Sequence, residues 1–94
     1  MTIPAKFRGF VDASGRISRL PVKWGKKAEL ADWLLEQLES GRAYSEPELN
    51  EIFEEYVDDF ALMRRLLVDS GKLERDRYGY EYRRVSAEYS GLRG

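Results

Sequence analysis

Catalytic side chains are scarce in this sequence, since its 94 residues include neither histidine nor cysteine. Histidine is the commonest general base of enzymes, and cysteine is the most reactive of their side-chain nucleophiles. Asp58 and Asp59 are adjacent, but neighbouring carboxylates at a helix start diverge and favour capping over acid–base chemistry. We therefore expect no enzymatic activity and no catalytic residue.

Metal and phosphate sites have little more support. Glu51, Glu54, Glu55 and Asp58 could share one helical face and bind a hard cation such as Mg²⁺, although their spacing is not that of a calcium loop. A solvated helix face is the simpler interpretation. The stretch 24–27 holds a glycine near a helix start but lacks the spacing of a phosphate-binding loop. We expect no metal and no cofactor.

The first basic set lies near the amino terminus and contains one tryptophan. Its members are Arg16, Arg19, Lys23, Lys26 and Lys27, with Trp24 among them. Lysines at the start of a helix oppose the helix dipole, and this cost suggests an anionic partner such as a phosphate or an acidic protein. A purely structural role remains the alternative.

A second basic set lies near the carboxyl terminus and alternates with tyrosines. It consists of Arg75, Arg77, Arg83 and Arg84, with Tyr78, Tyr80 and Tyr82 interleaved. Aromatic rings among arginines suit base stacking or backbone tracking on a nucleic acid. Alternatively, one tyrosine face packs on the core and the arginines keep an edge strand soluble.

Arg64 and Arg65 have side chains suited to guanine edges or phosphates. Acids surround them, however, and we favour pairing with Glu54, Glu55, Asp58 or Asp69. The stretch 46–59 has seven acids and no base, so carboxylates at the start of the third predicted helix would repel phosphates there. This argues against ordinary major-groove docking by that helix start.

The charge of the chain is divided by region, although the net charge is only −1. Residues 1–27 hold seven basic side chains and one acidic one. Residues 28–69 hold three basic and twelve acidic side chains, and residues 70–94 hold six basic and four acidic ones. The division indicates distinct surface regions, or ends and middle that attract each other in the fold. No apolar run is long enough for a membrane span or a secretory signal, and we expect a cytoplasmic protein without membrane contact.

Hydrophobic periodicity predicts three helices, at about 26–39, 46–57 and 59–70. Leu30, Leu34 and Leu38 repeat every four residues in the first, and Gly41 follows as its C-cap. Ser45 with Glu48 forms a capping box for the second helix. For the third, Asp58 or Asp59 is the cap, and its inward stripe is Phe60, Met63, Leu66 and Leu67.

Turn residues predict two hairpins. The first spans about 7–21 around a turn that contains Gly15, and Pro21 ends its second strand. The second spans about 72–85 around Tyr78-Gly79, in a register that two turn lengths fit equally well. We expect residues 86–94 to form a frayed tail. The chain is thus predicted to be one α+β domain over 1–94, a winged-helix-like three-helix core with a C-terminal hairpin wing and an added N-terminal β-hairpin.

The same residues resemble a bacterial family, the domain of unknown function number 2087. The resemblance is carried by Phe10-Val11-Asp12, Gly15-Arg16-Ile17, Tyr44-Ser45-Glu46, Glu48-Leu49-Asn50, Arg64-Arg65 and Leu67-Val68-Asp69, and runs from about Phe7 to Val85. Members occur alone or behind helix-turn-helix regulators, which implies a transcription-linked setting and no particular activity. Many members carry a histidine where this chain has Val57, and any role of that histidine would be missing here.

These observations favour a non-enzymatic, regulator-type module that binds DNA or RNA directly or through a partner. The residues expected to bind nucleic acid are Lys23, Lys26, Lys27, Arg64, Arg65, Arg75 and Arg77. The alternative is a module for protein contact or homodimerisation, in which the acidic middle helices dock a basic partner without touching DNA.

Overall fold

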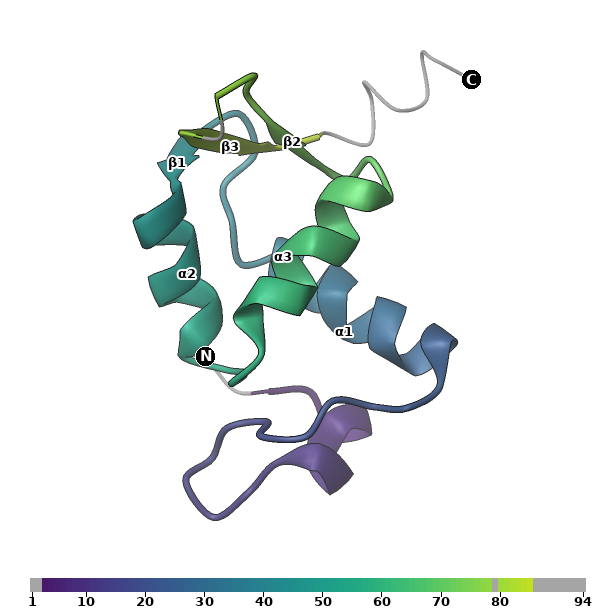
Figure 1. Cartoon of the computed structure of the whole chain (residues 1–94). Helices are drawn as coiled ribbons and strands as arrows, with labels where there is room; N and C mark the ends of the chain where they lie inside the picture. Colours follow the sequence, from purple (N-terminus) through teal and green to yellow (C-terminus); the bar gives the residue numbers. More distant parts are fainter. Residues whose placement is uncertain (1–2, 79, 86–94) are drawn as a thin grey trace.

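Three helices and a small antiparallel sheet make up the computed structural model, which describes residues 3–78 and 80–85 (Figure 1). The α+β class predicted from the sequence is therefore confirmed. The elements are the 3₁₀ helix η1 (Ala5–Phe10), α1 (Trp24–Leu35), β1 (Ala43–Ser45), α2 (Glu46–Glu54), α3 (Phe60–Asp69), β2 (Leu73–Arg75) and β3 (Glu81–Arg84).

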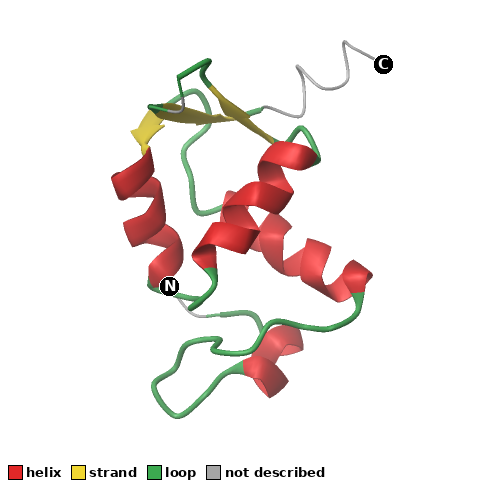
Figure 2. Cartoon of the chain, viewed as in Figure 1, coloured by secondary structure: helices red, strands yellow, loops and turns green. Residues whose placement is uncertain are grey.

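The sheet lies at one end of the helices, and the N-terminal segment lies at the other (Figure 2). The strand order of the sheet is β1-β3-β2, and both outer strands are antiparallel to β3. Tyr82 in β3 stands opposite Tyr44 on one side and Arg75 on the other. Because the chain enters α2 directly from β1 and leaves α3 close to β2, the sheet joins the ends of these two helices.

The hydrophobic core draws on every helix and strand. Fifteen buried residues form its central cluster: Phe7, Ile17, Leu30, Ala31, Leu34, Leu35, Leu38, Tyr44, Leu49, Phe53, Val57, Met63, Leu67, Leu73 and Tyr82. All of them are apolar or aromatic, and none of the described charged side chains is buried. Their burial removes apolar surface from water, which is the main force that holds the helices on the sheet.

Both ends of the α2–α3 pair are capped, and the sequence predicts the capping box at its start. Ser45 Oγ accepts the Glu48 N–H at 3.2 Å, and Glu48 Oε1 accepts the Ser45 N–H at 2.9 Å, which completes the capping box. At the end of α3, Gly71 adopts a φ of 78°. Its N–H donates to Val68 O and that of Lys72 to Leu67 O, the paired bonds of a Schellman motif.

Two helices end earlier than the periodicity predicts. Helix α1 begins at Trp24 and ends at Leu35 instead of Glu39, but Leu38 is still buried because i→i−3 hydrogen bonds continue the turn. Gly41 has a φ of 81° but follows these turns and does not cap the helix. Helix α2 ends at Glu54 instead of Val57, since Val57 bridges to the N-terminal segment.

The N-terminal β-hairpin predicted for residues 7–21 is wrong. Residues Ala5–Phe10 form η1, and a single bridge between Val11 and Ile17 replaces the two strands. The turn itself is as predicted, with Gly15 at a φ of 86°. Ile17 instead bonds across the fold: its N–H donates to Tyr56 O at 2.7 Å, and its carbonyl accepts the Asp58 N–H at 3.0 Å.

The C-terminal hairpin forms within the predicted range. Strand β2 pairs with β3 in a register that sets Leu73 opposite Arg84 and Glu74 opposite Arg83. Gly79 and the predicted frayed tail, residues 86–94, lie outside the described residues. Over the described part of the chain, every helix falls short of the length and apolar character that crossing a bilayer requires.

Candidate nucleic-acid interface

A pocket of about 350 Å³ lies between α3 and the C-terminal hairpin. It is lined by Ala61, Arg64, Arg65, Val68, Asp69, Arg75 and Tyr82, and we call it the α3–hairpin pocket. Three residues predicted to bind nucleic acid, Arg64, Arg65 and Arg75, therefore meet at one site. Arg64 and Arg65 come from α3, and Arg75 comes from β2, which pairs with β3 and contacts α3.

Arg64 is the fixed member of this group, with only 20% of its side chain exposed. Its Nη2 lies 3.5 Å from Glu46 Oε1, and its Nη1 donates to Asn50 Oδ1. The guanidinium also lies 5.9 Å from the centre of the Tyr82 ring. The prediction that Arg64 forms an ion pair is confirmed, but with Glu46 on α2 in place of the expected acids.

Tyr82 connects the sheet to the same network. Its hydroxyl donates to Glu46 Oε2 at 3.0 Å, and its ring is buried. Burial raises the pKa of Tyr82 above its ordinary value, and the hydrogen bond to Glu46 raises it further. The phenol therefore stays protonated and holds Glu46 in position beside Arg64.

Arg65 and Arg75 are the exposed cations of the pocket. Arg65 Nε lies 3.7 Å from Asp69 Oδ2, in an i,i+4 pair whose side chains are 80% and 66% exposed. Such exposed pairs contribute little to stability, so Arg65 can exchange Asp69 for another anion at small cost. Arg75 is exposed on β2. The pocket thus combines one anchored arginine with two that remain available to a ligand.

The two acids at the start of α3 are both engaged within the protein. Asp58 Oδ1 lies 2.7 Å from Arg16 Nη1, so its charge is compensated. Asp59 caps α3, where its Oδ1 accepts the Leu62 N–H at 3.2 Å. The expected repulsion of phosphates by this helix start is accordingly weaker than the sequence alone indicates.

The N-terminal lysines do not join the α3–hairpin pocket. Lys23, Lys26 and Lys27 lie at the start of α1, which Figure 1 places away from the sheet and beside the N-terminal segment. Lys26 Nζ is 3.6 Å from Glu29 and 5.8 Å from the Phe7 ring centre. These lysines form a separate basic surface, next to the exposed Trp24.

The tyrosines of the C-terminal hairpin divide between the core and the solvent. Tyr82 is buried, whereas Tyr78 and Tyr80 are exposed and stack on each other. Among the arginines interleaved with them, Arg77 is exposed and Arg84 Nη1 donates to Leu38 O at 3.0 Å. Core packing is therefore confirmed for Tyr82, whereas base stacking by the exposed Tyr78 and Tyr80 stays a prediction.

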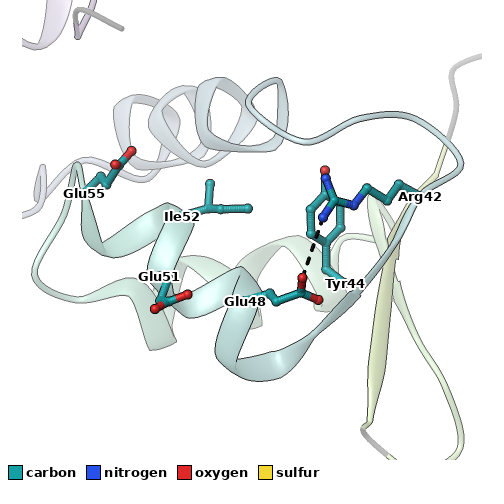
Figure 3. A pocket seen from close by; sticks show the side chains of 6 residues that line it. All are labelled: Arg42, Tyr44, Glu48, Glu51, Ile52 and Glu55. Carbon is teal, nitrogen blue, oxygen red and sulfur yellow. Dashed lines mark ion pairs between the residues drawn. The ribbon is translucent and has the colours of Figure 1, made fainter.

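A larger pocket, of about 520 Å³, lies beside α2 and is mainly acidic. Figure 3 shows the side chains that line it: Arg42, Tyr44, Glu48, Glu51, Ile52 and Glu55. Arg42 lies over the Tyr44 ring at 4.6 Å and pairs with Glu48 at 3.6 Å. Within residues 3–78 and 80–85, no cluster of three or more His, Cys, Asp or Glu side chains is placed to hold a metal ion.

The fold and these pockets define a small α+β domain with a basic helix–hairpin pocket and an acidic helix face. The chain belongs to the bacterial family described as "Uncharacterized protein conserved in bacteria (DUF2087)", which matches residues 16–84. This range begins at Arg16, which pairs with Asp58, and ends at Arg84, the last residue of β3. No curated protein and no solved structure matches the chain.

Proposed function

We propose that this chain is a non-enzymatic, transcription-linked module that binds nucleic acid through the α3–hairpin pocket. The observation that carries the proposal is the convergence of Arg64, Arg65 and Arg75 on one pocket from two separate elements. Guanidinium groups bind phosphate in a bidentate manner, and an anchored arginine beside two exposed ones can orient a phosphate and contact its neighbours. Such a role belongs in the cytoplasm of a bacterium.

The arrangement of the elements supports an interpretation as a winged helix. A helix, a short strand, two closely joined helices and a hairpin follow one another, and the sheet order is β1-β3-β2. A joint of five residues, 55–59, connects α2 and α3, slightly longer than the turn typical of a helix-turn-helix pair. In such pairs the second helix contacts the nucleic acid, and here that helix carries Arg64 and Arg65.

Fluorescence anisotropy with labelled DNA and RNA of mixed sequence, at about 50 mM salt, tests the proposal. We expect Arg65→Ala and Arg75→Ala each to weaken binding by about tenfold, since hydrogen bonds to charged groups contribute at least this much. Arg19→Ala is the matched control, because it removes the same charge from the exposed N-terminal segment. Wild-type protein that binds neither nucleic acid at low salt would refute the proposal.

A second candidate function is contact with another protein, favoured by the acidic pocket beside α2. Glu48, Glu51 and Glu55 line it together with Ile52, a mixture of charge and apolar surface that suits a basic partner. Light scattering decides whether the partner is a second copy of this chain. A dimer that Glu51→Lys dissociates, in protein without affinity for nucleic acid, would favour this function over the first.

A further inference from the structure

Two exposed tyrosines form a stacked pair at the tip of the C-terminal hairpin. The ring centres of Tyr78 and Tyr80 are 6.0 Å apart, and the ring planes differ by 25°. The two residues are 69% and 72% exposed. Most of each ring is therefore open to solvent, although the two rings stack on each other.

This exposure is unusual for the chain. The described residues include only four exposed large hydrophobic side chains, and two of them are this pair. Tyr82 on the same hairpin is buried, so the hairpin contributes one of its three described tyrosine rings to the core and leaves two outside. Large aromatic surfaces left in water commonly mark a binding site.

We infer that the Tyr78–Tyr80 pair is a stacking platform for unpaired bases, which makes single-stranded nucleic acid the substrate class. The inference rests on the proposed function and deepens it. In a duplex the base faces are covered by neighbouring base pairs, whereas single strands offer them to aromatic side chains. A platform at a hairpin tip meets base faces only where bases are unpaired.

The platform lies close along the chain to one residue of the α3–hairpin pocket. Arg75 lines the pocket, and Tyr78 follows it by three residues, a reach of about 10 Å at most along the chain. Between them lie Asp76, whose Oδ1 accepts the Tyr80 N–H at 2.8 Å, and the exposed Arg77. A strand whose phosphates contact Arg75 thus presents its next bases to the tyrosine rings, the combination of cationic track and aromatic rings typical of single-strand binding.

A purely structural role would have a different signature. If the stack only stabilises the hairpin, its removal would lower the stability of the protein and weaken all ligands alike. Replacement of each tyrosine by phenylalanine keeps the ring and removes only the hydroxyl. The Phe variants are therefore the matched controls for stacking, and the Ala variants remove it.

The experiment compares the wild-type chain with Tyr78→Ala, Tyr80→Ala and the two corresponding Phe variants. Anisotropy measures binding to a labelled single-stranded RNA, the same DNA sequence and a blunt-ended duplex of equal length. We expect the wild type to prefer single strands over the duplex by about fivefold or more, from the stacking of one base. The Ala variants should lose this preference, and the Phe variants should keep it.

A second readout is the fluorescence of 2-aminopurine placed in the single strand. Binding to the wild type should change this fluorescence through stacking, and binding to the Ala variants should leave it unchanged. Ala variants that unfold would be replaced by Tyr78→Leu and Tyr80→Leu, which keep apolar bulk without an aromatic face. Ala or Leu variants that keep the wild-type preference for single strands would overturn the platform. The proposed function would still stand if Arg75→Ala weakens the binding of every nucleic acid tested. Wild-type protein that binds no nucleic acid would overturn both.

Discussion

Arg16 Nη1 lies 2.7 Å from Asp58 Oδ1, and the same guanidinium donates from Nε to Glu54 O at 2.9 Å and from Nη2 to Val57 O at 3.2 Å. One side chain from the N-terminal segment therefore closes the turn between α2 and α3. The carbonyls at the end of α2 lack partners within the helix, and Arg16 supplies one. This contact and the backbone bonds of Ile17 both hold the turn that places α3, with Arg64 and Arg65, beside α2.

Arg16→Ala should lower the free energy of unfolding by about 1–3 kcal/mol, because it removes charge-assisted bonds to two carbonyls as well as one ion pair. Arg65→Ala is the control, since its exposed pair with Asp69 should contribute no more than about 0.5 kcal/mol. Urea denaturation measures both. Equal effects of the two substitutions would contradict the role given to Arg16.

Replacing either of two glycines by alanine should change the free energy of unfolding, but in opposite directions. Gly71 ends α3 at a φ of 78°, and Gly25 lies inside α1, while an added Cβ at either position would meet no heavy atom within 4 Å. Only backbone conformation then decides the effect. Gly71→Ala should destabilise the protein by about 1 kcal/mol, and Gly25→Ala should stabilise it by about 0.4–1 kcal/mol. Thermal and urea unfolding measure both changes in stability. Two changes in the same direction would contradict this explanation.

Stability should fall in acid, partly through Glu48. Hydrogen bonds from the Ser45 N–H and hydroxyl hold the pKa of Glu48 below its ordinary value of 4.5. Because the folded pKa is the lower one, the contribution of the carboxylate is complete above 4.5 and is lost as the pH falls through the folded pKa.

Glu48→Gln keeps a capping side chain but cannot titrate. The stability difference between wild type and Glu48→Gln should therefore be larger at about pH 7 than at about pH 3, as urea midpoints at each pH would report. A difference that grows on acidification would contradict the assigned capping role.

Local patterns predicted the α2–α3 pair well. The capping box at Ser45, the cap at Asp59 and the stripe of Met63 and Leu67 all depend on residues within one or two turns of each other. The start of α2 and both ends of α3 therefore fall within two residues of the predicted bounds. Periodicity failed where burial continues without helical hydrogen bonds, as at Leu38 after the end of α1.

Contacts between distant segments were beyond a sequence-based prediction. Ile17 has the residue type of a strand, but its backbone bonds go to Tyr56 and Asp58 across the fold. The pairing of Arg64 with Glu46 requires α2 and α3 to be placed first, and nothing in the spacing of these residues indicates it. The meeting of Arg75 with α3 likewise depends on the sheet register that local turn chemistry left open.

The salt dependence of nucleic-acid binding tests the central claim most directly. For a single strand, the slope of log Kobs against log salt concentration changes by about 0.7 for each phosphate contact removed. The double variant Arg65→Ala/Arg75→Ala should therefore flatten the slope by about 1.4 relative to wild type, while Lys26→Ala/Lys27→Ala leaves it unchanged. A slope that the lysine variant flattens and the arginine variant does not would contradict binding through the α3–hairpin pocket.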